Sequence, residues 1–180
     1  KSVCAIVINP KNGEILGLVN YPEADLNNLD RSDLEMLASL SRNTIITDAY
    51  EPGSTFKIIT TAAALDSGTI DTETTFECAG AKIVDGERIK CWRSGRPHGH
   101  QTLTQAVENS CNPAFMEMAL RMGTDKFYEY IYNFGFGKNT GVDFSTDGSG
   151  IIRAAKYIKN VDLARIGFGQ SIACTPLQLA

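Results

Sequence analysis

The segment Glu51-Pro52-Gly53-Ser54-Thr55-Phe56-Lys57 places a hydroxyl and an amine three residues apart at the start of a predicted helix. Residues at positions i and i+3 lie on one face of a helix, so the Lys57 amine can approach the Ser54 hydroxyl. An amine in that position can take the hydroxyl proton and so activate a weak serine nucleophile. The helix dipole would also favour the negative charge that develops near Ser54.

The helix that begins at Ser54 is predicted to extend to about Leu65 and to end at Gly68. Its apolar residues recur at helical spacing and cover almost its whole circumference. A helix of this kind is expected at the buried centre of a domain, so the segment that carries the serine and the lysine also predicts where the core lies.

Strands and further helices are expected on either side of this central helix. Two short apolar runs, 3–8 and 15–19, flank a turn and predict a β-hairpin whose apolar side chains are buried. A capping box begins a later helix at Thr102, and Asn112-Pro113 begins another. Strands at the start and helices in the middle predict an α+β fold, or a mixed α/β sandwich.

The composition is that of an ordinary globular protein, with 43% hydrophobic and 21% charged residues. The net charge of −4 gives no indication of a nucleic-acid partner, and no apolar run approaches the length of a membrane span. No signal peptide is visible, and the chain begins at Lys1 without an initiator methionine, as an excised piece would. Its five cysteines cannot all pair with one another.

A second group of polar residues, Ser110-Cys111-Asn112, lies between two predicted helices. A hydroxyl and a carboxamide at positions i and i+2 of such a turn can point into one cleft. The hydroxyl can relay a proton, and the carboxamide can bind a substrate amide while it holds a lysine in place. Cys111 would then point away from the cleft.

Ser-x-x-Lys on a buried helix, followed by Ser-x-Asn, resembles the signature of penicillin-recognising serine acyltransferases. The finer resemblance is to class B penicillin-binding proteins, the D,D-transpeptidases of bacterial cell walls. It implies a transpeptidase fold, which is serine β-lactamase-like, with residues 1–180 as a partial domain. The Ser-Cys-Asn-Pro form of the second motif and the presence of the cysteines resemble what is found in homologues from spore-forming Gram-positive bacteria, including sporulation-specific members. The segments that carry the resemblance are 7–16, 42–43 with 51–57, 98–99 with 102–103 and 110–115, and 167–170 with 175–178.

One family motif, Lys-Thr-Gly or Lys-Ser-Gly, is not found in this sequence. Lys138-Asn139-Thr140-Gly141 carries an extra residue and lies in a predicted loop too early in the chain. The resemblance therefore implies that the motif, its strand and one of the two oxyanion-hole N–H groups lie beyond Ala180, and that the C-terminal part of the fold is missing from the chain.

By resemblance, the reaction is a two-step acyl transfer. Ser54 attacks the carbonyl between two D-alanines of a peptidoglycan stem peptide, and Lys57 accepts its proton. Ser110 helps to pass a proton to the departing D-alanine, and Asn112 binds the peptide and positions Lys57. The acyl-enzyme is then taken by an amine of a neighbouring stem, and a β-lactam would acylate Ser54 and stay.

Two other enzyme activities fit the same residues: a D,D-carboxypeptidase and a serine β-lactamase, which differ in how fast water clears the acyl-enzyme. A covalent β-lactam sensor domain is an alternative of another class. The resemblance also implies a place at the extracytoplasmic face of the cell membrane, with a single N-terminal anchor outside this chain. It implies a lipid II glycosyltransferase as partner, besides stem peptides and β-lactams.

Two cysteines and the only two histidines form a candidate metal site, Cys78, Cys91, His98 and His100. Two thiolates and two imidazoles suit tetrahedral Zn²⁺, and an extended backbone would place both histidines on one side. Asp85 is a reserve ligand. Such a zinc ion would be structural, because four protein ligands leave no open position, and catalysis needs no cofactor.

Two alternatives to zinc remain open for these residues. Cys78 and Cys91 could form a disulfide, as expected for an extracytoplasmic domain. Both could instead be free thiols, with His98 holding the following loop by hydrogen bonds.

Overall fold

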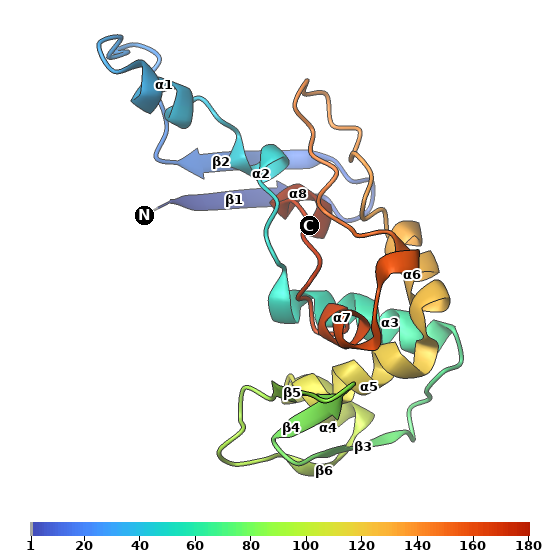
Figure 1. Ribbon diagram of the computed structural model, residues 1–180. Helices are drawn as coiled ribbons and strands as arrows, with labels where there is room; N and C mark the ends of the chain where they lie inside the picture. Colours follow the sequence, from blue (N-terminus) through green and yellow to red (C-terminus); the bar gives the residue numbers. More distant parts are fainter. Residues whose placement is uncertain (1) are drawn as a thin grey trace.

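The computed structural model describes residues 2–180. Its central helices lie between a β-hairpin at one end and a small region of short strands at the other (Figure 1). The mixed helix-and-strand fold predicted from the sequence is confirmed. The strands are β1 (Val3–Ile8), β2 (Ile15–Tyr21), β3 (Thr75–Cys78), β4 (Ala81–Val84), β5 (Glu87–Lys90) and β6 (Gly99–Thr102). The α-helices are α1 (Leu34–Leu40), α2 (Thr44–Thr47), α3 (Lys57–Asp66), α4 (Leu103–Glu108), α5 (Asn112–Met122), α6 (Thr124–Asn133), α7 (Asn160–Ile166) and α8 (Pro176–Leu179).

The main core forms where α3, α5, α6 and α7 pack together. Phe56 is fully buried there, and its ring meets the rings of Phe127 and Phe136 edge to face, at 6.5 and 5.2 Å between centroids. The helix predicted from Ser54 is present, although its first three residues belong to a 3-10 turn, η1 (Gly53–Phe56). The prediction that this helix is buried on all sides was wrong, because Ile58 of α3 is 74% exposed.

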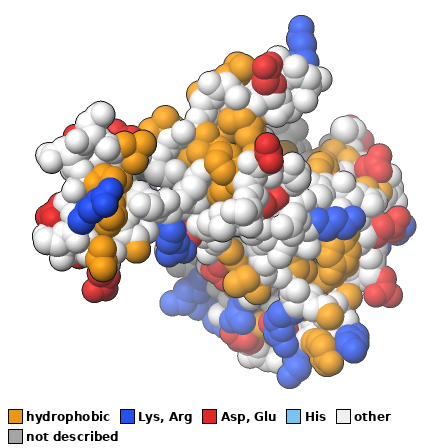
Figure 2. Space-filling view, turned by 90° about the horizontal axis from the view of Figure 1, so that it is seen from above, with side chains coloured by type: hydrophobic (Ala, Val, Ile, Leu, Met, Phe, Trp, Pro, Cys, Tyr) orange, Lys and Arg blue, Asp and Glu red, His pale blue; other side chains and the backbone are white. Residues whose placement is uncertain are grey.

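The hairpin β1–β2 is present as predicted, but only one of its faces is covered. Strand residues alternate between two faces, and the covered face packs on Ile45, Ile46 and Leu177. Apolar side chains of the other face, such as Val7 and Val19 at 55% exposure each, reach solvent. Figure 2 views the molecule from this end and shows apolar side chains on its surface. The prediction of full burial was therefore wrong for half of the hairpin.

The small region of strands consists of two antiparallel pairs, β3–β6 and β4–β5. The β4–β5 hairpin turns at Asp85-Gly86, and Cys91 directly after it donates its N–H to the Gly80 carbonyl at 2.9 Å. In the other pair Cys78 lies opposite Gly99. The open end of the hairpin and the end of β3 therefore lie together.

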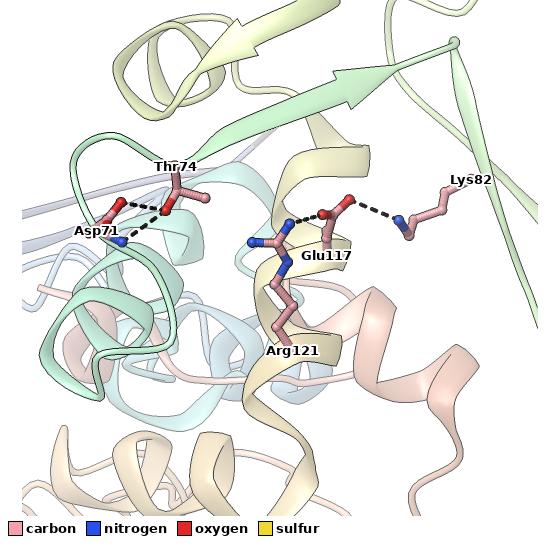
Figure 3. Close-up of polar contacts among 5 residues, drawn as sticks. All are labelled: Asp71, Thr74, Lys82, Glu117 and Arg121. Carbon is pink, nitrogen blue, oxygen red and sulfur yellow. Dashed lines mark hydrogen bonds and ion pairs between the residues drawn. The ribbon is translucent and has the colours of Figure 1, made fainter.

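An ion cluster joins this region to the middle of α5 (Figure 3). The Glu117 carboxylate accepts from Lys82 of β4 at 3.0 Å and from Arg121 one helical turn further along α5. In the loop before β3, the Thr74 hydroxyl donates to Asp71 at 2.7 Å.

Among the described residues, no helix is long and apolar enough to cross a membrane.

Candidate active site

Ser54 lies in the 3-10 turn that leads into α3, and its side chain is exposed. The residue before it, Gly53, has a positive φ of 58° and donates its N–H to the Gly169 carbonyl at 2.9 Å. Gly169 is itself at φ +80°, and a Cβ there would lie 2.0 Å from the Gly53 oxygen. Only glycine allows this backbone approach, so the loop at Gly169 fixes the turn that presents Ser54.

Lys57 is the centre of the polar cluster, because its side chain is only 4% exposed and contacts both sequence motifs. Its Nζ lies 3.3 Å from the Ser54 hydroxyl, one helical turn away as the spacing predicts. It also lies 2.9 Å from the Ser110 hydroxyl and 2.7 Å from Asn112 Oδ1. A fourth contact, at 2.8 Å, is with the backbone carbonyl of Ser110.

These four oxygens outnumber the three hydrogens of a lysine ammonium group. The carbonyl of Ser110 and the carboxamide oxygen of Asn112 can only accept, so they orient the amine. The hydroxyls of Ser54 and Ser110 can both donate. A neutral Lys57 has one lone pair for such a hydroxyl, and the arrangement therefore allows the proton of Ser54 to pass to Lys57.

Burial lowers the pKa of Lys57 from 10.5 to about 8, although nearby Cys91 and Cys111 oppose the shift. With this pKa, about a tenth of the amines are neutral at pH 7, whereas an ordinary lysine is almost entirely charged. A base whose pKa lies near the working pH combines availability with basicity. Lys57 is thus suited to accept a proton under near-neutral conditions.

The second motif occupies the tight connection between α4 and α5. Thr102 and Gln105 form the predicted capping box, which fixes the start of α4. At the other end Ser110 has φ +48°, a left-handed conformation that is unfavourable for a residue with a side chain. The turn brings both the hydroxyl and the carbonyl of Ser110 to Lys57, and α5 then begins at Asn112 with Pro113 in its first turn.

A cavity of about 350 Å³ opens in front of Ser54, Ser110 and Asn112. Trp92 and Gln170 also line it. The sequence did not indicate that Trp92 lies beside the cavity. Its indole N–H donates to the Asn109 carbonyl at 2.9 Å, which holds the ring next to the second motif.

A second cluster of reactive side chains adjoins the same motif. Cys78, Cys91, His98 and Cys111 each offer one ligand atom, and these atoms all lie within 4.8 Å of one another. The three cysteines are buried, and His98 is half-buried. Three of the four metal ligands predicted from the sequence are therefore together. Cys111 does point away from the cleft, as expected, but its place in this cluster was missed.

His100 and Asp85 do not belong to the cluster, so their assignment as ligands was wrong. Gly99 has a left-handed φ of 69°, which breaks the extended backbone that would place both histidines on one side. His100 is instead exposed on β6, with Nδ1 3.8 Å from a Glu77 carboxylate oxygen. Asp85 lies at the turn of the β4–β5 hairpin, at the end opposite Cys91, and accepts from Asn160 at 3.2 Å.

All five cysteines are free thiols in the structure. The Cys78–Cys91 disulfide that the sequence left open is thus not formed there. Cys4 is exposed on the hairpin and Cys174 is buried, and neither joins the cluster.

The sequence matches the family described as penicillin binding protein transpeptidase domain over residues 3–180. It is 42% identical over 175 residues to stage V sporulation protein D of Bacillus subtilis. The aligned residues make up 97% of this chain and 26% of that protein. It is 29% identical to the Escherichia coli peptidoglycan D,D-transpeptidase FtsI over 180 residues, 100% of this chain and 29% of that protein.

Among solved structures, the TP domain of Burkholderia pseudomallei penicillin-binding protein 3 superposes with a TM-score of 0.83 at 26% identity. The match covers 99% of this chain and 48% of that one. The chain thus spans less than a third of the length of these two curated relatives and about half of the solved domain. The likeness extends over all the elements that carry the two polar clusters.

Proposed function

Because this chain belongs to the penicillin-binding protein transpeptidase family, in its class B, we propose that it carries the nucleophile, base and second motif of a peptidoglycan D,D-transpeptidase. One observation supports this more than any other: the buried Lys57 amine contacts Ser54, Ser110 and Asn112 at once. A serine that served only as a helix cap would not need a buried amine beside it. The name of the Escherichia coli relative, a peptidoglycan D,D-transpeptidase, agrees with a role in cell-wall synthesis.

In the first step, Ser54 Oγ attacks the carbonyl between two D-alanines, and its proton passes to neutral Lys57. The peptide bond breaks, and the terminal D-alanine leaves after its amine has gained that proton from Lys57 through Ser110, which leaves Lys57 neutral again. The Asn112 carboxamide accepts from Lys57 through Oδ1, and its Nδ2 donates one hydrogen to the Lys90 carbonyl at 3.4 Å, so the other hydrogen remains to donate to the substrate peptide. The exposed position of Ser54 at the cavity leaves room for this attack.

In the second step, an amine of a neighbouring stem peptide attacks the acyl-serine. The attacking amine gives up a proton to Lys57 as the peptide crosslink forms, the bond to Ser54 breaks, and that proton passes from Lys57 to Ser54 Oγ. A β-lactam would follow the first step only, because its opened ring stays attached and blocks the second attacker. The cavity in front of the three polar side chains is where either acyl group would lie.

Fluorescent penicillin tests this proposal directly. The full-length protein should become labelled and keep the label through denaturation, whereas Ser54→Ala should stay unlabelled. Ser67→Ala is the matched control, since that hydroxyl lies at the other end of α3, where it contacts the Ala64 carbonyl and the Thr69 hydroxyl. Rapid release of the label would contradict a transpeptidase and indicate a β-lactamase, and release of free D-alanine without crosslinking would indicate a carboxypeptidase.

We also propose the setting that the family implies. The transpeptidase would work at the outer face of the cytoplasmic membrane, where stem peptides are exposed, with a glycosyltransferase that polymerises lipid II as its partner. The 42% identity to a protein named for stage V sporulation supports a role in sporulation. A deletion strain that grows normally but sporulates poorly would agree with that role, and a strain that fails to divide or elongate would contradict it.

A further inference from the structure

We propose that Cys78, Cys91, His98 and Cys111 bind one structural Zn²⁺ ion, which fixes the segment that carries Ser110 and Asn112. The four ligand atoms lie within 4.8 Å of one another although the residues are spread over 34 positions of sequence. The three sulfurs are buried together, with exposures of 0% at Cys78, 2% at Cys91 and 0% at Cys111.

The distances suit a tetrahedral zinc ion. With Zn–S bonds of about 2.3 Å and a Zn–N bond of about 2.0 Å, neighbouring ligand atoms lie about 3.5–3.8 Å apart. The His98 Nδ1 atom lies 3.7 Å from Cys91 Sγ. The remaining ligand atoms, none more than 4.8 Å apart, need only small side-chain rotations to reach the same spacing.

The donor set also selects the metal. Thiolate sulfur and neutral imidazole nitrogen are ligands that Zn²⁺ prefers, whereas Mg²⁺ and Ca²⁺ prefer oxygen. On binding, the three thiols release their protons to solvent, and three thiolates around a dication leave a net charge of −1. No electron is transferred, so neither an oxidant nor a reductant is required.

Hydrogen bonding alone does not account for this cluster. The Nε2 atom of His98 is buried and has no hydrogen-bond partner among the described residues, and Nδ1 faces only the Cys91 sulfur. A contact of 3.7 Å with one sulfur is too weak to fix the imidazole ring, and a bond from Nδ1, the nitrogen that faces the sulfurs, to a metal would fix it. A disulfide would use two of the three sulfurs and leave the third thiol and the imidazole unexplained.

The four ligands come from four different places in the fold. Cys78 ends β3, Cys91 follows β5, His98 precedes β6, and Cys111 is the N-cap of α5. One ion would therefore tie both strand pairs to the start of the helix whose first residue is Asn112. Because four protein ligands leave no open position, the ion would act through structure and not through contact with substrate.

Cys111 gives the ion its connection to the active site. It lies between Ser110 and Asn112, whose side chains both contact Lys57. Ser110 is in a left-handed conformation that the surrounding structure has to maintain. A metal–sulfur bond at the next residue would hold that turn. Cys111 is thus proposed as a positioning residue for the second motif.

Metal content is the first measurement. The full-length protein, purified without added chelator, should contain about one zinc ion per chain by elemental analysis. Removal of the ion with a strong chelator should lower the melting temperature, and the three cluster thiols should become reactive toward a thiol reagent as zinc leaves. Added ZnCl₂ should restore the melting temperature and protect the thiols again.

Substitutions then identify the ligands. Cys111→Ala should lose the zinc, whereas Cys111→His, which supplies another ligand, should retain it. Cys174→Ala and His100→Ala are the matched controls and should keep the full zinc content, since one is a buried cysteine and the other a histidine outside the cluster. If Cys111→Ala does not fold, the chelation experiment on the unmodified protein still decides the question.

Several results would overturn the proposal. A zinc-free protein with a disulfide between two of the cluster cysteines would do so, as would a zinc-free protein with three reactive thiols. Zinc that survives in Cys111→Ala but is lost in His100→Ala would exclude this ligand set. Metal content is measured without penicillin, so the two proposals can fail separately. A protein that lacks zinc but is acylated contradicts only the proposed zinc site. A protein that contains zinc but is not acylated contradicts only the proposed function.

Discussion

Two clusters of side chains share the short segment from Ser110 to Asn112, and they differ in access to solvent. Ser110 and Asn112 contact Lys57 at a cavity where Ser54 is exposed. Cys111, between them, belongs to a thiol and imidazole cluster whose three sulfurs are buried. An open cluster can take a substrate and perform chemistry. A closed one can only hold the chain in place, so the two are expected to respond differently to substitution.

The difference predicts which measurement each cluster controls. Side-chain changes at the open cluster should alter the acylation rate far more than the melting temperature. Changes at the closed cluster should lower the melting temperature first, and acylation only as a consequence. Four variants or conditions test this contrast, beginning with the one of largest expected effect.

Lys57→Met should reduce the rate of acylation by penicillin by about 10²–10⁴-fold, the usual contribution of a general base. The melting temperature should change little, because the substitution also removes a charge whose burial already lowers the pKa of Lys57 to about 8. The rate is measured with fluorescent penicillin and the stability by thermal denaturation. Lys138→Met, in the loop after α6, is the control; an acylation rate equal to wild type in Lys57→Met would exclude this lysine as the base.

The acylation rate should also depend on pH in the direction that a neutral Lys57 requires. Below its pKa of about 8 the amine is mostly protonated, so the rate should rise about tenfold per pH unit from pH 6 and level off above pH 8. An unperturbed lysine would place that plateau above pH 10. A rate that is flat between pH 6 and 8, or that falls, would contradict the role of Lys57.

The open cluster could be predicted from the sequence because its geometry is local. Ser54 and Lys57 are one helical turn apart, and Ser110 and Asn112 are two positions apart, so secondary structure alone nearly fixes each pair. The family resemblance supplied what local geometry could not, namely that the two pairs meet.

The closed cluster was only partly predictable, because its membership depends on how loops fold in three dimensions. His100 was chosen on the assumption of an extended backbone, and the left-handed Gly99 breaks that assumption. A signal for Cys111 was present, since twelve residues separate His98 from Cys111 just as twelve separate Cys78 from Cys91. The half-exposed hairpin has a similar cause: alternation predicts two faces but does not say which one is covered.

Gly169→Ala should destabilise the protein, because the backbone next to the open cluster is tightly packed. The side chains of the open cluster are expected to contribute little to stability. The new Cβ would lie 2.0 Å from the Gly53 carbonyl oxygen, and φ is +80°. Overpacking of this kind costs about 1–3 kcal/mol, so the melting temperature and the acylation rate should fall together. Gly68→Ala is the control, because its φ is +67° but nothing lies within 4 Å of the added Cβ. Equal losses in both variants would mean that φ strain, and not the contact with Gly53, is responsible.

The smallest effect is expected where an ion pair, and not the closed cluster, joins the strand region to α5. Burial raises the pKa of Glu117, but Lys82 and Arg121 outweigh it and hold the pKa below its ordinary value (Figure 3). The Lys82 and Glu117 side chains are still 31% and 24% exposed, and a pair of this kind contributes about 1 kcal/mol or less. Lys82→Met should therefore lower the melting temperature by only a few degrees, and less in high salt, with unchanged zinc content. Lys126→Met, which breaks a more exposed pair with Glu129 on α6, should cost less still. If Lys82→Met destabilised the protein as much as removal of the proposed zinc ion, the ion pair would be the main link between the strands and α5. The closed cluster would then not have the structural role that distinguishes it from the open cluster.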